Sequence, residues 1–373
     1  MKKAKLFGLA TVALASIMLL GACGSGGSNS TDSTGGGSDE GKDPKHSAAI
    51  VTDIGGIDDR SFNQSAWEGL QAWGKEHKLE KGVGGFNYFQ SNDASQYTTN
   101  IDNAVSNGFK TVFGVGYLLT DAISQAADQN ADNNFVIIDS VIDGKNNVAS
   151  ATFKDNEASY LAGYAAAYTT KTNKVGFIGG EEGVVIDRFD AGFTQGVKDA
   201  AKKLNKDITI ENEYAASFND AAKGKALAAA MYRDGVDVIF HASGGTGAGV
   251  FSEAKELNKK STEAELKDKK VWVLGVDSDQ EAEGKFQTAD GKDDNCTLAS
   301  TLKGVGAAVQ DISNRALEDK FPGGEHLVYG LKDGGVDLTE GFLSDDAKKA
   351  INEVKTEVAD GKVEVPETPK DVK

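Results

Sequence analysis

The 373-residue chain has little cysteine, little histidine and a deficit of positive charge, and each shortage excludes a class of protein. Its two cysteines, Cys23 and Cys296, cannot form a framework of several disulfides. It has four histidines and neither a zinc-binding motif nor a Ser/His/Asp catalytic arrangement. Its net charge of −17 argues against nucleic-acid binding and against electrostatic attachment to anionic lipid. Stability must come from burial, and residues 48–365 suffice for two hydrophobic cores.

The N-terminus also has an apolar run that is shorter than a typical membrane-spanning helix. Three lysines precede an apolar run from Leu6 to Leu20, whereas a spanning helix needs about 20 residues. A positive start, a short apolar run and small residues before a cleavage point are typical of an export signal. Cys23 ends a Leu-Gly-Ala-Cys sequence that resembles the bacterial lipobox, in which the cysteine is lipidated and becomes the first mature residue. The alternative is an ordinary secretory signal with an incidental cysteine.

We therefore expect residues 1–22 to be a lipoprotein signal peptide and Cys23 to hold the protein on the outer face of a bacterial cell membrane. Residues 23–47 consist largely of Gly, Ser, Asp and Thr, with almost nothing to bury. Such a segment is predicted to be a flexible tether with a reach of roughly 25–30 Å. If Cys23 carries lipid, no intramolecular disulfide to Cys296 is possible.

Short apolar runs alternate with segments of helical spacing along the rest of the chain. The predicted strands are 48–52, 86–89, 111–115, 135–138, 174–178, 208–210, 236–240, 271–276 and 296–301. The predicted helices are 61–77, a segment around 97–105, 119–129, a segment around 193–204, and 220–233. Alternating strands and helices predict an α/β fold with parallel sheets covered on both faces, and two such series predict two Rossmann-like lobes.

Polar residues follow several predicted strands directly, in both halves of the chain. They are Asp53, Asp139, His241, Ser243, Gly244 and Asp277. In open α/β sheets, ligands bind beyond the carboxyl ends of the strands, so two facing lobes would place these residues around one cleft. Each aspartate alone could instead cap a helix, and the recurrence in both halves favours the cleft.

Six stretches, taken in order, resemble one known family. They are Asp53–Gln64 (DIGGIDDRSFNQ), Asn156–Tyr164 (NEASYLAGY), Gly192–Val197 (GFTQGV), Ser243–Gly249 (SGGTGAG), Gly275–Gln280 (GVDSDQ) and Ser300–Lys303 (STLK). The chain resembles the basic membrane protein family of substrate-binding lipoproteins, of the PnrA-like purine-nucleoside-receptor type, over nearly everything after residue 48.

The resemblance implies a type I periplasmic-binding-protein fold whose chain crosses three times through a hinge. It divides the chain into an N-terminal lobe of residues 48–154 plus 277–305 and a C-terminal lobe of residues 155–276 plus 306–365. It also implies the permease and ATPase subunits of an ABC importer as partners. The expected ligand is guanosine, inosine or adenosine, bound by a monomer without cofactor, metal or catalysis.

The resemblance assigns roles to nine residues. Phe62 and Phe218 would stack on the two faces of a purine base, although Phe62 could also be a core residue of its helix. The base-edge contacts would be Asp53, Asn63 and Asp139. The sugar contacts would be Asp277, which accepts both ribose hydroxyls, Lys303, which donates to the sugar and partly neutralises Asp277, and the close backbone of Gly244 and Gly245.

Several alternatives remain at this stage. The run from Ser243 to Gly249 could bind a phosphate, but it lacks the lysine of a phosphate-binding loop and acids are expected nearby. His241 could contact the ligand or be a satisfied, half-buried histidine, and we favour the second. Asp58 and Asp59 could belong to an exported nucleoside hydrolase but are more simply capping residues. A sugar-like ligand or a surface antigen with a vestigial cleft are the other candidates.

Replacement of Cys23 by Ala tests the lipid anchor. The variant is expected to leave the membrane fraction or to remain uncleaved, because it lacks the thiol that accepts the lipid. Cell fractionation and intact mass measure both outcomes. An unmodified Cys23 in the membrane fraction of the wild-type protein would contradict the prediction.

Overall fold

The computed structural model describes residues 47–373, so the predicted signal peptide, Cys23 and nearly all of the predicted tether lie outside the described residues. The fold begins one residue earlier than predicted. Ser47 is buried, and its hydroxyl donates to the Gly108 carbonyl at 3.1 Å. Within residues 47–373, no helix combines the length and the apolar character that a membrane crossing requires.

The first lobe is built on a six-stranded, wholly parallel sheet in the order β13-β5-β4-β3-β1-β2. Its strands are β1 (Ala48–Thr52), β2 (Phe86–Phe89), β3 (Thr111–Val115), β4 (Asn134–Ile138), β5 (Val148–Phe153) and β13 (His326–Tyr329). Its helices are α1 (Phe62–Glu76), α2 (Tyr97–Ser106), α3 (Thr120–Gln129) and α9 (Val305–Leu317). Alternate strand residues face different helices: Ile50 packs in the core with α1 and α9, whereas Val51 packs with α2 and α3.

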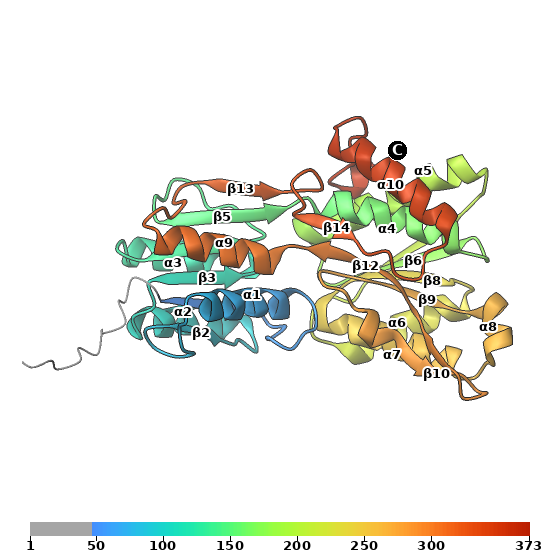
Figure 1. The fold of residues 1–373 in the computed structure, drawn as a ribbon, viewed down its shortest axis with the longest axis horizontal. Coiled ribbons are helices and arrows are strands. Elements are labelled where there is room, and N and C mark those ends of the chain that lie inside the picture. Colours follow the sequence, from blue (N-terminus) through green and yellow to red (C-terminus); the bar gives the residue numbers. More distant parts are fainter. Residues whose placement is uncertain (1–46) are drawn as a thin grey trace, which may run out of the picture. The chain divides into compact units, whose positions relative to one another are not determined.

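The second lobe repeats this plan with the sheet order β14-β12-β9-β8-β6-β7 (Figure 1). Its strands are β6 (Lys174–Gly179), β7 (Thr209–Tyr214), β8 (Val238–Ala242), β9 (Trp272–Gly275), β12 (Thr297–Lys303) and β14 (Val336–Leu338). Only β14 in this sheet pairs antiparallel, with β12. Its helices are α4 (Asp155–Thr169), α5 (Val184–Leu204), α6 (Ala221–Arg233), α7 (Gly247–Asn258), α8 (Glu263–Lys269) and α10 (Asp345–Ala359). A hairpin of β10 (Lys285–Gln287) and β11 (Asp293–Asn295) is attached.

The chain passes between the two sheets three times, after β5, after β12 and between β13 and β14, as a type I periplasmic-binding-protein fold requires. The predicted assignment of residues 277–305 and 306–365 to lobes is wrong for β12, α9 and β13, whereas β14 and α10 lie in the second lobe as predicted. Strand β12, predicted within the N-terminal lobe, pairs with β9 in the second sheet. Helix α9 and strand β13, predicted within the C-terminal lobe, belong to the first. The spacing of apolar residues predicts that a segment is a buried strand, but it does not predict which of the two sheets the strand joins.

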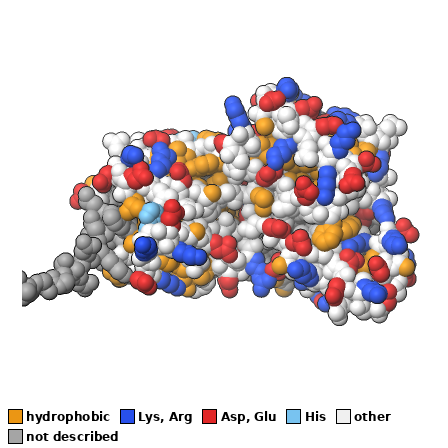
Figure 2. Space-filling view, in the orientation of Figure 1, with side chains coloured by type: hydrophobic (Ala, Val, Ile, Leu, Met, Phe, Trp, Pro, Cys, Tyr) orange, Lys and Arg blue, Asp and Glu red, His pale blue; other side chains and the backbone are white. Residues whose placement is uncertain are grey.

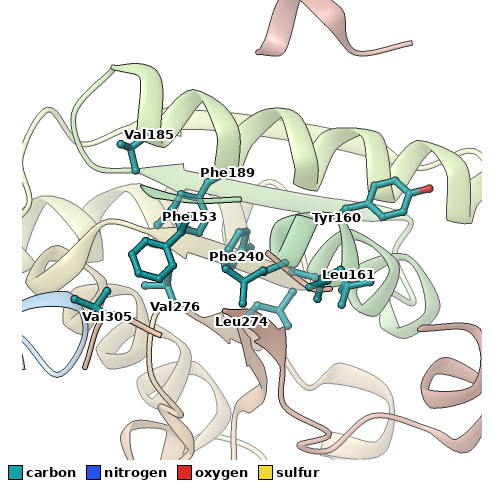
Figure 3. Close-up of a cluster of buried hydrophobic side chains, with 14 of the residues drawn as sticks. Phe153, Tyr160, Leu161, Val185, Phe189, Phe240, Leu274, Val276 and Val305 are labelled. Carbon is teal, nitrogen blue, oxygen red and sulfur yellow. The ribbon is translucent and has the colours of Figure 1, made fainter. Parts of the chain in front are cut away.

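Apolar side chains from both lobes pack together where the chain passes between the two sheets. Figure 3 shows Phe153, from the end of β5, beside Phe189 of α5 and Val276 after β9. All three are buried members of one core cluster, as is Val305 at the start of α9. The hinge is therefore embedded in hydrophobic core. The visible surface, in contrast, carries basic and acidic side chains interspersed over both lobes (Figure 2).

Helices α4 and α5 cross with their backbones in contact, because glycines lie at the crossing. A Cβ atom on Gly192 would lie 2.2 Å from the carbonyl oxygen of Asn156, and one on Gly196 would lie 2.2 Å from that of Tyr160. Both obstacles are backbone atoms, which cannot rotate away as side chains can. The crossing therefore requires glycine at both positions of α5.

The replacement Gly196→Ala is expected to destabilise the protein. The added methyl group overpacks the crossing, which should cost roughly 1–3 kcal/mol of stability. This cost outweighs the gain in helix propensity, which is at most about 1 kcal/mol. Denaturant unfolding measures the difference, with Lys198→Ala on the exposed face of the same helix as the control. Equal stability of the wild type and Gly196→Ala would show that the helices can separate without cost.

Candidate functional site

A cavity lies between the two lobes and is partly open to solvent. The space between its lining residues, together with the solvent at its opening, is about 540 Å³. Eight of the nine predicted ligand-binding residues line it: Asp53, Phe62, Asn63 and Asp139 from the first lobe, and Phe218, Gly244, Asp277 and Lys303 from the second. The ninth, Gly245, instead lines a neighbouring cavity with Arg60 and Gln280.

The cavity lies at the carboxyl ends of parallel strands in both sheets, which is where open α/β sheets bind ligands. Asp53 follows β1, Asp139 follows β4, and Lys303 ends β12. The sheet orders make β4 and β9 equivalent strands, so Asp139 and Asp277 occupy related places in the two lobes. Both have left-handed backbones, with φ of 66° and 65°. This conformation is uncommon for residues other than glycine and occurs frequently at functional sites.

Lys303 makes contacts that were not predicted. Its Nζ lies 2.6 Å from Asp139 Oδ2 and 3.0 Å from Asp155 Oδ1. Lys303 also lowers the pKa of Asp277, in line with the expected partial neutralisation, but its direct ion pairs are to Asp139, across the cleft, and to Asp155, at the start of α4. Asp277 instead accepts a hydrogen bond from the Ser61 hydroxyl. Sequence reasoning missed Asp155 because an acid in the first turn of a helix is ordinary.

The side-chain amide of Asn63 is fixed by two carboxylates. Its Nδ2 donates to Asp53 Oδ1 at 2.7 Å and to Asp59 Oδ2 at 2.9 Å. Asp59 also accepts backbone N–H groups of Ser61, Asn63 and Gln64, which confirms its predicted capping role. The oxygen of the amide, Asn63 Oδ1, is buried and has no hydrogen-bond partner among residues 47–373, and the same is true of Asp139 Oδ1. Both residues line the cavity, and a buried polar atom without a partner is uncommon in folded proteins.

Aromatic rings from both lobes border the cavity. Phe62, at the first position of α1, and Phe218, before α6, are half-buried and line it from different lobes. The Lys303 ammonium lies 5.1 Å from the centroid of the Phe62 ring. Tyr117, which was not predicted, meets Phe218 edge-on at 6.4 Å. Phe189, Val185 and Ile186 of α5 also line the cavity and were not predicted, because core and cavity positions look alike in a helical pattern.

Comparisons with known proteins place the chain in one family of binding proteins. Residues 46–369 match the family model described as "ABC transporter substrate-binding protein PnrA-like". The chain belongs to this family. It is 52% identical to the "ABC transporter nucleoside-binding protein BmpA" of Lactococcus lactis, over 98% of this chain and 99% of that one. It is 48% identical to the "CD4+ T-cell-stimulating antigen" of Listeria innocua, over 98% of this chain and all of the relative.

A solved solute-binding protein of an ABC transporter system from Aeropyrum pernix shares the fold, with a TM-score of 0.74 and 23% identity. The similarity covers 87% of this chain and 94% of that one. As a substrate-binding protein of the PnrA-like family, the chain works with the permease and ATPase subunits of an ABC transporter and binds a ligand.

His241 in this family member is not at the end of its strand. Strand β8 runs on to Ala242, so His241 lies inside it, fully buried and outside the cavity lining. Burial lowers its pKa to about 4, so the imidazole is neutral. The preferred interpretation, a satisfied histidine, is confirmed, although the side chain is fully rather than half buried. No group of three or more potential metal-binding side chains occurs within the described part of the chain.

Burial and neighbouring charges shift the pKa values of Asp53, Asp277 and Lys303. Burial raises the pKa of Asp53 to about 7, against the opposing effect of hydrogen bonds from Gly55 N–H and Asn63. Burial raises the pKa of Asp277 to about 6, and Lys303 and Ser61 oppose it. Burial alone would lower the pKa of Lys303, but the neighbouring carboxylates raise it above its usual range. The lysine is therefore charged, while Asp53 and Asp277 take up protons nearer neutrality than free carboxyl groups do.

The raised pKa of Asp53 predicts a pH dependence of stability. A carboxyl group whose folded pKa exceeds its unfolded value, about 3.9, stabilises the fold most at low pH and loses this contribution as pH rises through about 7. Asp53→Asn stays neutral and keeps an oxygen for Gly55 and Asn63. It is expected to lose less stability than the wild type between pH 5 and 8, by roughly 1–3 kcal/mol.

Denaturant unfolding at pH 5, 6, 7 and 8 measures this difference. Asp58→Asn, at the exposed neighbouring acid, is the control and should follow the wild-type profile. Parallel profiles for Asp53→Asn and the wild type would show that Asp53 is already ionised at pH 5.

Proposed function

We propose that this substrate-binding protein captures a purine nucleoside in the interlobe cavity and delivers it to its ABC importer. In the same proposal, a lipid on Cys23 holds it at the outer face of the cell membrane. The observation that carries the proposal is the combination of Phe62 and Phe218, from different lobes, with acceptor oxygens around one small cavity. The relative at 52% identity, named a nucleoside-binding protein, supports the same ligand class.

The two phenyl rings suit a flat, aromatic ligand. Stacking of a base on an aromatic side chain contributes about 1–3 kcal/mol per base and is available to any purine. Because the rings belong to different lobes, a base between them would be in contact with both. This arrangement makes full binding conditional on the two lobes coming together.

The polar groups suit an uncharged ligand that donates hydrogen bonds. Asn63 Oδ1 and Asp139 Oδ1 can accept from ring or exocyclic N–H groups, and Asp277 can accept from vicinal ribose hydroxyls. The cavity places Asp53, Asp139 and Asp277 around a single lysine that is already ion-paired. A phosphate group would be repelled there, so the proposal is for nucleosides and not nucleotides.

Binding without catalysis is part of the proposal. Asp59 caps a helix, Asp139 and Asp155 pair with Lys303, and Asp277 accepts from Ser61. Each of these acids thus has a partner in the described chain, which supports a binding role over the free acid/base pair that a hydrolase requires. Incubation with guanosine followed by an assay for free guanine distinguishes the two, because a hydrolase releases base with time and a binding protein does not.

Alanine variants at Asp139 and Asp277 are expected to weaken the binding of different nucleosides. Asp277→Ala removes the acceptor for the ribose and should weaken guanosine and adenosine alike, by about 1.5–3 kcal/mol, and should abolish any preference over 2′-deoxyguanosine. Asp139→Ala removes a base-edge acceptor and should weaken guanosine and inosine more than adenosine. The reason is that guanosine and inosine present a ring N–H where adenosine presents a bare nitrogen.

Calorimetry with the four nucleosides measures these effects, with Asp58→Ala as the control in an exposed position. Unchanged guanosine affinity in Asp139→Ala would place the base elsewhere in the cavity. Unchanged affinities in both variants, or no binding to the wild type, would reject the nucleoside class. Native mass spectrometry of the purified protein would then identify the ligand, including a sugar-like one.

A further inference from the structure

A turn of the first lobe, residues 59–61, contacts the second lobe beside the ligand cavity. The Gln280 amide Nε2 donates to the Arg60 carbonyl at 3.1 Å. The Ser61 hydroxyl donates to Asp277, and the Arg60 guanidinium pairs with Glu283. The Arg60–Glu283 pair is largely exposed on the arginine side and is screened by water. Gln280 is 5% exposed, so its hydrogen bond to Arg60 is better shielded from water than the Arg60–Glu283 pair, and the Ser61–Asp277 hydrogen bond is buried.

The orientation of the Gln280 amide is dictated by its neighbours. Its Oε1 accepts the Val276 backbone N–H at 3.0 Å and lies 3.0 Å from His241 Nε2. An amide oxygen can only accept, so it must face these two nitrogens, and the NH₂ group must face the other way. The Arg60 carbonyl lies there. Rotation of the amide by 180° would oppose donor to donor on one side and acceptor to acceptor on the other.

His241 is held so that it can donate to Gln280. The neutral imidazole must carry its proton on Nε2, because Gln280 Oε1 is an acceptor. Nδ1 is then an acceptor, and the Ser243 hydroxyl lies 3.4 Å from it. A Cβ on Gly247 would lie 2.1 Å from the imidazole ring, so glycine makes room for the ring. Ser243 also lines the ligand cavity, so the chain of hydrogen bonds runs from the cavity to the lobe contact.

Arg60 contributes an uncommon backbone conformation. Its φ is 57°, in the left-handed region, which costs a residue other than glycine roughly 1–2 kcal/mol. The same residue, Arg60, has the carbonyl oxygen that accepts the hydrogen bond from Gln280 of the second lobe. Strain of this kind persists only where surrounding contacts fix the backbone.

We propose that His241 and Gln280 form a latch that holds the lobes closed around the ligand. His241 is the positioning residue: its Nε2–H fixes the Gln280 amide, and the Gln280 NH₂ group binds the Arg60 carbonyl of the first lobe. The latch slows ligand release without touching the ligand. The inference rests on the proposed function, because release of a bound nucleoside requires the lobes to separate.

The replacement Gln280→Glu tests the latch with almost no change of shape. One carboxylate oxygen can still accept from Val276 N–H and His241. The other replaces the NH₂ group and opposes the Arg60 carbonyl, acceptor against acceptor. At pH 8 we expect guanosine to dissociate about tenfold faster than from the wild type, with an association rate changed less than twofold. At pH 5 protonation of the new carboxyl restores a donor, and the two dissociation rates should converge.

Matched controls separate the latch from general effects. The groups that titrate or carry charge around the new carboxyl include His241, Asp277, Glu283 and Arg60, together with Asp58 and Asp59, which line the same neighbouring cavity as Gln280, and all are present in the wild type measured at each pH. Gln125→Glu makes the same substitution on the exposed face of α3 and should leave the rates unchanged. His241→Gln keeps an N–H donor and should release guanosine nearly as slowly as the wild type. His241→Leu removes the donor and should release it faster.

The outcomes distinguish this proposal from the proposed function. If Gln280→Glu and His241→Leu release guanosine at the wild-type rate at pH 8, the latch is rejected while nucleoside binding stands. If the wild type does not bind guanosine, nucleoside binding is rejected, and the latch is judged by hydrogen exchange of residues 59–64 without ligand. Faster exchange in Gln280→Glu than in Gln125→Glu at pH 8 supports the latch, and equal exchange rejects it.

Discussion

The buried ammonium group of Lys303 is the charge on which the cavity depends. Its side chain is 4% exposed and contacts two carboxylates directly, that of Asp139 in the cleft and that of Asp155 beneath it in the buried interior. Transfer of an ion pair from water into a protein interior is costly, and removal of one partner leaves an uncompensated charge at a typical cost of about 3–5 kcal/mol. Lys303 belongs to the second lobe, Asp139 to the first, and Asp155 begins the helix that follows the first crossing. One cation therefore holds three parts of the molecule in register.

The packing around this charge explains how it is tolerated. The rings of Phe62, Phe153 and Phe189 lie 5.1 to 5.7 Å from the Lys303 ammonium and present their electron-rich faces to a cation. Phe189 projects from α5, whose glycines allow close contact with α4 and so bring Asp155 and Phe189 to the same end of the lobe. The backbone crossing of two helices and the electrostatics of the cleft are thus parts of one arrangement.

Much of this fold could be predicted from sequence because its strands are short, apolar and bounded by turns. Strands β1, β2 and β3 have the predicted bounds. Strand β5 was missed because Ser and Thr interrupt the apolar residues of its sequence, VASATF, although every residue is buried. Helix α4 showed no helical pattern because it is buried on nearly all sides and lacks a polar face. The β13 and β14 strands are three or four residues long and give too little signal.

Most of the residues that line the cavity could be predicted from the sequence, but their contacts with one another could not. Polar residues after strands gave Asp53, Asp139 and Asp277, and the family resemblance added the phenyl rings and Lys303. The partners of these residues could not be inferred, because hydrogen bonds depend on atoms brought together from both lobes. Lys303 forms ion pairs with Asp139 and Asp155 and none directly with Asp277. His241 forms a hydrogen bond with Gln280 and does not line the cavity.

The return of the chain to the first sheet has a consequence for folding. Strand β13 pairs with β5 although the whole second lobe separates them in sequence, and α9 covers a face of the first sheet beside α1. During synthesis, the first lobe therefore lacks an edge strand and a covering helix until most of the chain has been made. Contacts of such sequence separation close large loops and slow folding. The two lobes should consequently mature as one cooperative unit near the end of synthesis, and a truncated chain ending before α9 would expose apolar surface and an unpaired strand edge, the conditions that favour aggregation.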